Sequence, residues 1–139
     1  MDPVRAYLLQ LGAAEHVVAG GLLGLVERWE RIAQETAAGR VLDLDNWRND
    51  LDTRQLLADA LPHAPAPESA RFHSRLAAAD LELRRATQPL PACIWPAAVA
   101  KREGWQPRSN WWYFVRPTRL GPEFAAELEA WSERVEPDL

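Results

Sequence analysis

The chain has 139 residues, of which 47% are hydrophobic and 26% charged, values that fit a globular protein with a substantial core. Its longest apolar run is about half the length that a bilayer-spanning helix needs. The formal net charge of −4 argues against binding to a phosphate backbone. Fifteen of the sixteen basic residues are arginine, a bias typical of a GC-rich genome when alanine, leucine and proline are also abundant.

Cys93 is the only cysteine, so the chain forms no internal disulfide. The first residues lack the basic region and the apolar stretch of a signal peptide. We therefore expect a soluble protein that stays in the cytoplasm and does not enter a membrane.

The N-terminal half of the chain predicts three helices. Asp2 followed by Pro3 is a typical helix start, with a capping carboxylate before the proline, and predicts a short helix over residues 3–11. A long amphipathic helix is predicted over residues 14–38, where apolar side chains recur at spacings of three and four. A third helix is predicted to begin near residue 45 and to end at Leu61, before a proline.

Three glycines interrupt the first half of the long helix, and two interpretations are open. Gly20 and Gly24 share a helical face, which favours close approach of a neighbouring backbone. The alternative is a kink near Gly20. We favour close packing.

The C-terminal half begins with a stiff, proline-rich connection over residues 62–67. Residues 68–87 then show the apolar seam of an antiparallel bundle. A short helix is predicted around residues 95–101, and the last helix begins at Pro122. Between them, residues 105–117 contain five consecutive aromatic or β-branched side chains, which predict an extended segment or a short strand. No second strand is evident, so we expect this segment to pack on helices or to pair with another chain.

The predicted fold is therefore all-α. It is a single-domain bundle of five or six helices spanning residues 1–139, with the long helices antiparallel. The aromatic segment at 105–117 packs on them.

Residues 43–54 hold four aspartates, two arginines and a tryptophan. Carboxylates this close repel one another, so a cap, an arginine or a partner has to compensate for them. One interpretation is structural: Asp43 or Asp45 caps the third helix, and Asp50 or Asp52 pairs with a nearby arginine. The other interpretation is an acidic docking face.

A metal site is the catalytic alternative for these aspartates, with residues 43, 45, 50 and 52 on a divalent ion. Residues 41–46 resemble the aspartate opening of haloacid-dehalogenase-type phosphatases, but no second pair of metal-binding aspartates follows downstream. A calcium loop that starts at Asp43 has Arg48 where glycine is required. The sequence predicts no catalytic residue, metal site or cofactor.

Seven tryptophans are several times the usual frequency. Three of them, Trp29, Trp47 and Trp131, occupy apolar helix positions and are expected to be buried. The other four lie in irregular chain near arginines: Trp95, Trp105, Trp111 and Trp112. Three roles are open for these rings. They seal one end of the bundle, act as hot spots of a protein interface, or stack on nucleic-acid bases. The acidic balance of the chain places nucleic acid last.

The stretch from Trp29 through Gly39 to the Asn49-Asp50-Leu51 run and Arg54 resembles a group of small helical bacterial proteins. In these a helix with a tryptophan leads through a glycine into an aspartate-rich stretch, followed by leucines. Some of them belong to the broad company of immunity proteins to bacterial toxins. The resemblance covers residues 25–61 and implies a compact helical domain that binds another protein.

The function we expect is non-catalytic protein binding in the bacterial cytoplasm, including immunity-type neutralisation of a toxin. The acidic segment favours a basic protein partner. A homodimer that uses the seam of residues 68–87 or the segment 111–115 is an alternative. The candidate partner-binding residues are Asp43, Asp45, Trp47, Arg48, Asp50, Asp52, Trp111 and Trp112.

Overall fold

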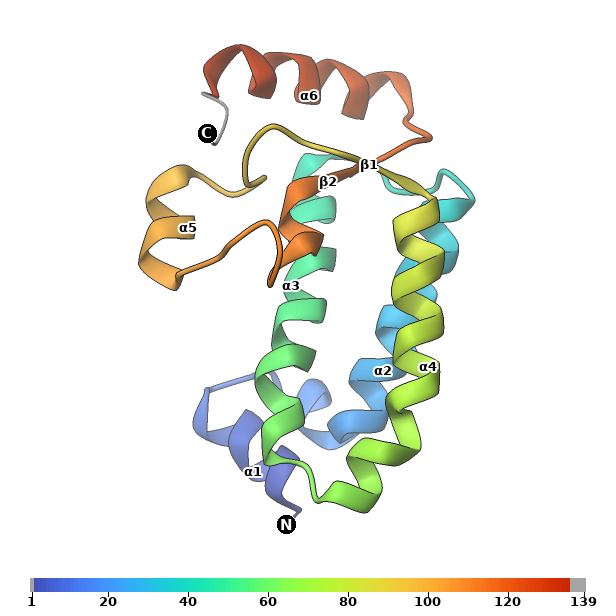
Figure 1. Cartoon of the computed structure of the whole chain (residues 1–139), viewed down its shortest axis with the longest axis vertical. Helices are drawn as coiled ribbons and strands as arrows, with labels where there is room; N and C mark the ends of the chain where they lie inside the picture. The colour runs from blue at the N-terminus through green and yellow to red at the C-terminus, as the bar shows by residue number, and fades with distance from the viewer. Residues whose placement is uncertain (1, 136–139) are drawn as a thin grey trace.

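The computed structural model describes residues 2–135, which confirm the all-α class (Figure 1). The elements in chain order are α1 (Pro3–Gln10), α2 (Glu15–Ala37), α3 (Leu44–Ala60), the 3-10 turn η1 (Leu61–His63), α4 (Ala66–Arg85), β1 (Thr87–Pro89), α5 (Ala97–Glu103), the 3-10 turn η2 (Trp111–Phe114), β2 (Val115–Pro117) and α6 (Pro122–Arg134).

Helices α2, α3 and α4 form the body of the molecule and run up, down and up (Figure 1). Helix α3 is therefore antiparallel to both neighbours, as expected. Helices α2 and α4 are parallel, because two chain reversals separate them, so the expectation that all long helices are antiparallel is wrong for this pair. Helix α1 packs at one end of the body, and α6 crosses the other end (Figure 1).

Capping side chains set the starts of two helices. Asp2 Oδ1 accepts a hydrogen bond from the backbone N–H of Arg5 at 2.9 Å, and Asp43 Oδ1 accepts from that of Asn46 at 2.8 Å. Helix α3 thus begins slightly earlier than predicted. At its other end α3 is followed directly by η1, which contains Pro62, because proline is tolerated in the first turn of a helix.

A kink at Gly21 breaks the regular course of α2. Its backbone has φ +59° and ψ −154°, a conformation that only glycine adopts without strain. A Cβ placed on Gly20 or Gly24 would meet no atom within 4 Å, so no neighbouring backbone approaches there. The interpretation of close packing is therefore wrong, and the kink is correct.

The core confirms the burial of Trp29, Trp47 and Trp131, which are 0%, 0% and 3% exposed. The indole N–H of Trp29 donates to Asp80 Oδ1 at 2.9 Å. Arg54 also donates to this carboxylate, from Nε to Oδ1 at 2.9 Å and from Nη2 to Oδ2 at 3.1 Å. One carboxylate on α4 thus joins α2, α3 and α4 through charge-assisted hydrogen bonds.

The segment 105–117 is extended only at its end. Residues 111–114 form η2, and β2 pairs antiparallel with β1, with Gln88 opposite Arg116. The strand therefore has its partner within the chain. The sequence pattern did not show β1, because it follows α4 directly and is only three residues long. Prolines at Pro89 and Pro117 keep this ribbon short, since proline lacks the N–H of a ladder.

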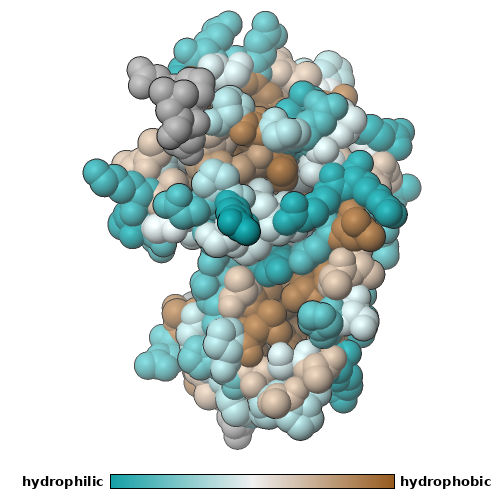
Figure 2. Space-filling view, viewed as in Figure 1, coloured by the Kyte–Doolittle hydropathy of each residue, from teal (hydrophilic) through white to brown (hydrophobic). Residues whose placement is uncertain are grey.

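The surface of the body is not uniformly polar. In the space-filling view, hydrophobic residues line a hollow between α3 and α4 (Figure 2). Leu42, just before α3, is 72% exposed, the largest value among the exposed large hydrophobic side chains. No helix within residues 2–135 has both the length and the apolarity to cross a bilayer.

Substitution of the glycines by alanine tests the kink. Gly21→Ala should lower the free energy of unfolding by about 1–3 kcal/mol, because of the positive φ and because the added Cβ lies 3.2 Å from Arg5 Nε. Gly24→Ala should raise it by up to about 1 kcal/mol, since alanine favours a helix interior. Urea denaturation measures both values, and equal effects of the two substitutions would contradict a kink confined to Gly21.

Candidate functional site

The eight residues singled out in the sequence do not lie on one surface. Asp45 is exposed, whereas Trp47 and Trp112 are 0% and 3% exposed. The remaining five are half-buried: Asp43, Arg48, Asp50, Asp52 and Trp111. Most of the polar side chains of α3 thus face other parts of the same chain.

Asp43 is the helix cap, and its carboxylate also accepts from Asn46 Nδ2 at 3.0 Å. Asp45 lies in the first turn of α3, where the helix dipole stabilises a negative charge. The backbone N–H of Leu44 donates to Glu127 Oε1 of α6 at 3.3 Å, which places a further carboxylate beside this helix start. The structural interpretation therefore holds for the helix start.

Asp50 faces α2 and forms no ion pair with either arginine of the segment; the ion pair of Arg54 is made with Asp80 instead. Burial raises the pKa of Asp50 to about 6, while Arg28 opposes the rise and Glu35 adds to it. This carboxyl group therefore favours its neutral form in the folded protein near pH 5.

Asp52 connects α3 with the aromatic segment. One carboxylate oxygen accepts from the hydroxyl of Tyr113 at 2.6 Å and from the indole N–H of Trp95 at 3.1 Å. Burial raises the pKa of Asp52, and these two hydrogen bonds oppose the rise. Burial and the bond to Asp52 together raise the pKa of Tyr113, so the phenol remains a hydrogen-bond donor.

Arg48, one turn earlier on α3, holds the loop that precedes α5. Its Nε and Nη2 donate to the carbonyl oxygen of Ile94 at 3.0 and 2.8 Å, and its guanidinium lies 5.1 Å from the ring centre of Trp95. Burial lowers the pKa of Arg48, and the nearby charge of Asp45 opposes this. Arg48 thus fixes a loop carbonyl and a tryptophan at once.

Trp111 and Trp112 lie on the side of η2 that faces the long helices. The guanidinium of Arg84 lies 3.9 Å from the ring centre of Trp111, and that of Arg54 lies 4.5 Å from Trp112. These rings connect α3 with α4.

The aspartates of residues 43–52 do not converge. Within residues 2–135, no three His, Cys, Asp or Glu side chains are grouped so that they hold a metal ion. The metal-dependent alternative therefore gains no support from the arrangement of these carboxylates.

One polar side chain of α3, Arg48, also lines a cleft beside α6. A cavity of about 1070 Å³ lies between the loops that flank α5 and the C-terminal part of α6. Three indoles line it, from Trp95, Trp105 and Trp131. The ring of Trp105 stacks on Tyr113 with 4.0 Å between their centres, and Tyr113 is the residue bound to Asp52.

Among residues 2–135, the charged side chains that line the cleft are all cations. They are Arg48, Lys101 and Arg134, and among the described residues no aspartate or glutamate lines it. Buried Cys93 adds a thiol to the wall. A cleft that combines cations with tryptophan side chains is suited to bind an anion that also carries a ring or another apolar group.

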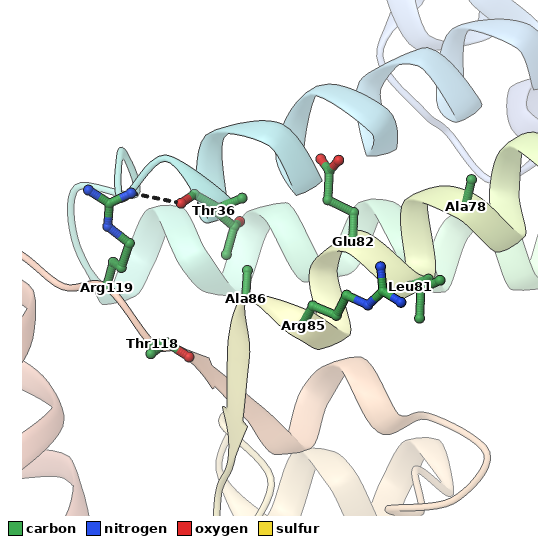
Figure 3. Close-up of a pocket in the computed structure, with 9 residues that line it drawn as sticks. Thr36, Ala78, Leu81, Glu82, Arg85, Ala86, Thr118 and Arg119 are labelled. Carbon is green, nitrogen blue, oxygen red and sulfur yellow. Dashed lines mark hydrogen bonds between the residues drawn. The ribbon is translucent and has the colours of Figure 1, made fainter.

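A second cavity, of about 550 Å³, lies between the C-terminal ends of α2 and α4 (Figure 3). It is mostly apolar, with Ala78 and Leu81 of α4 and the capping residue Ala86 in its wall. Arg119 closes one end, where its Nη1 donates to the carbonyl oxygen of Ala37 at 3.1 Å (Figure 3). This groove lacks the aromatic rings and the uniform charge of the cleft, so the cleft is the stronger candidate.

Sequence reasoning found part of the cleft and missed the rest. Trp95 and Trp105 stood out as tryptophans in irregular chain, and Arg48 stood out in the acidic segment. Lys101 and Arg134 gave no signal, because single exposed cations on helices are ordinary. Trp131 was correctly expected in the core, but it also lines the cleft.

No family model, curated protein or solved structure matches the chain. What the cleft binds has to follow from the chemistry of its own residues.

Substitution of Asp52 tests whether this carboxylate holds the wall of the cleft. Asp52→Ala leaves the Tyr113 hydroxyl and the Trp95 N–H without their acceptor and should cost about 2 kcal/mol of unfolding free energy. Asp52→Asn retains an acceptor oxygen and should cost less. Urea denaturation followed by tryptophan emission measures both, and equal losses would show that the acceptor has no special role.

Asp50 should make stability depend on pH. Its pKa is about 6 in the folded chain and near 3.8 ordinarily, so between these values the folded state binds more protons than the unfolded state. Stability therefore falls as pH rises through this window, and Asp50→Asn removes the penalty. Above pH 6 this variant should exceed the wild type by about 1 kcal/mol, after allowance for solvent screening.

Thermal melts at pH 4, 5, 6 and 7 would show the effect as a growing difference between the Asp50→Asn variant and the wild type. Asp45→Asn, at an exposed position of the same helix, is the matched control. A difference that stays constant across these pH values would contradict the raised pKa of Asp50.

Proposed function

We propose that this chain is a non-catalytic protein-binding module and that the cleft beside α6 is where its partner docks. The observation that carries the proposal is the convergence of three indoles and three cations on one cavity, from elements that are far apart in the sequence. Tryptophan and arginine are the residues that most often dominate binding energy in protein interfaces.

The rigidity of the cleft also supports docking. Trp95 is held by Asp52, and Trp105 is stacked on Tyr113, whose hydroxyl is bound to the same carboxylate. Side chains that are already ordered lose little conformational entropy when a partner binds. The free protein therefore presents its apolar contact surface in a nearly fixed form.

This site changes the charge expected of the partner. The acidic segment pointed to a basic partner, but Asp52 is committed to hydrogen bonds inside the protein, and Asp43 caps a helix. The charged side chains of the cleft are cations, so the partner surface that enters it is acidic. An immunity-type protein that neutralises a toxin in the bacterial cytoplasm is one form of this proposal, in keeping with the resemblance over residues 25–61.

Purification of the tagged protein from the cells that encode it tests the proposal. Arg134→Glu and Trp105→Ala should each reduce the amount of co-purified partner by about ten-fold or more, as for hot-spot residues. Arg102→Glu is the matched control, because Arg102 adjoins Lys101 on α5, is 70% exposed in its side chain and does not line the cleft. This control should retain the partner.

Two further results would contradict or redirect the proposal. A partner retained by both cleft variants would exclude the cleft. A partner lost with Asp45→Asn but not with Arg134→Glu would move docking to the acidic start of α3. Nuclease treatment before elution, and the mass of the complex, separate a protein partner from nucleic acid and from a second copy of this chain.

A further inference from the structure

Among the described residues, three cations and no carboxylate line the cleft. Lys101 and Arg134 form no ion pair within residues 2–135, and Arg134 lies close enough to Arg48 to lower the pKa of that guanidinium. Asp45 and Glu127 act on Arg48 from outside the cleft, and the effect of Asp45 is larger than the repulsion by Arg134. An anion placed inside the cleft would therefore interact favourably with Lys101 and Arg134, which have no ion-pair partner among the described residues.

The indoles add a second requirement. Trp95 and Trp105 are half-buried side chains that line the cleft, and the N–H groups of Trp105 and Trp131 make no hydrogen bond to any residue among 2–135. An indole N–H is a donor only, so it is paired by an acceptor such as a carboxylate oxygen. The flat faces are paired by an aromatic ring, with centres about 4.5–7 Å apart.

We propose that the cleft recognises an acidic segment of the protein partner that carries at least one aromatic side chain. This inference rests on the proposed function and gives the partner its chemistry. The volume of about 1070 Å³ exceeds what one side chain fills and suits several residues of an extended segment. A nucleic-acid strand is the less suitable occupant, because the chain as a whole carries a net charge of −4.

Three synthetic peptides of six residues test this chemistry, with alternating Glu and Phe, Gln and Phe, or Lys and Phe. Isothermal titration calorimetry on the full chain measures their affinities, and the peptides contain no tryptophan, so emission from Trp95 and Trp105 gives a second readout. The acidic peptide should bind at least about ten-fold more tightly than the neutral one, and the basic peptide should bind least.

Charge reversal supplies the matched variants. Lys101→Glu combined with Arg134→Glu should reverse the order, so that the basic peptide binds more tightly than the acidic one. Arg102→Glu changes the net charge on the same helix but not the cleft, and it should leave the order unchanged. A peptide of alternating Glu and Ala should bind weakly, because it lacks the ring.

Other outcomes would overturn the partner chemistry, the proposed function or the binding of a separate partner chain, as follows. The proposed partner chemistry is wrong if the wild type prefers the basic or the neutral peptide, or if it binds the Glu–Ala peptide as tightly as the Glu–Phe peptide. Cleft-dependent co-purification would then still support the proposed function. If no peptide binds and the cleft variants also keep the partner, the proposed function itself fails. Binding of the acidic peptide that appears only after Glu136→Gln and Asp138→Asn would identify the chain's own carboxylates as the occupant and overturn a partner in trans.

Discussion

The rest of the structure depends on the hydrogen bonds that the partly buried polar side chains of α3 make with other parts of the chain. This helix packs its apolar side chains against α2, while its other side is covered by the segment that leads from β1 to β2 (Figure 1). A polar group removed from water costs free energy unless it is hydrogen-bonded. Arg54 meets this need at Asp80, and Asp52 meets it at Tyr113 and Trp95. These bonds fix the relative positions of the helices and of the aromatic segment.

Helical geometry explains how four aspartates can occupy ten residues. Asp45 and Asp52 are seven residues apart, which separates them by about 10 Å along the helix axis. Asp50 and Asp52 are two residues apart and point about 200° from one another around the axis, one to α2 and the other to the aromatic segment. The charges that crowd the sequence are thus distributed around and along the helix, which weakens their repulsion.

The cleft is a consequence of the same bonds. Arg48 and Asp52 anchor the chain at Ile94 and Trp95, directly after Cys93, and the stacking of Trp105 on Tyr113 anchors the chain after α5. With both flanking loops of α5 held to α3, the space between them and α6 remains open as a cavity. A polar network inside the protein thereby positions a set of apolar walls and cations at its surface.

The sequence by itself determined the all-α class, the approximate bounds of the long helices and the burial of Trp29, Trp47 and Trp131, because apolar periodicity and capping are local properties. Close packing at Gly20 and Gly24 would require a neighbouring backbone, which the sequence does not reveal. Only the tertiary structure showed that no backbone approaches them and that the helix kinks at Gly21.

The candidate site was predictable only in part, for a related reason. The sequence showed which residues of 43–54 and 105–117 were unusual, but not which way α3 turns them. A rotation of 100° per residue decides whether an aspartate meets solvent, an arginine or a phenol. Lys101 and Arg134 became neighbours of Arg48 only through the placement of α5 and α6, because contacts between residues far apart in the chain arise from packing rather than from local pattern.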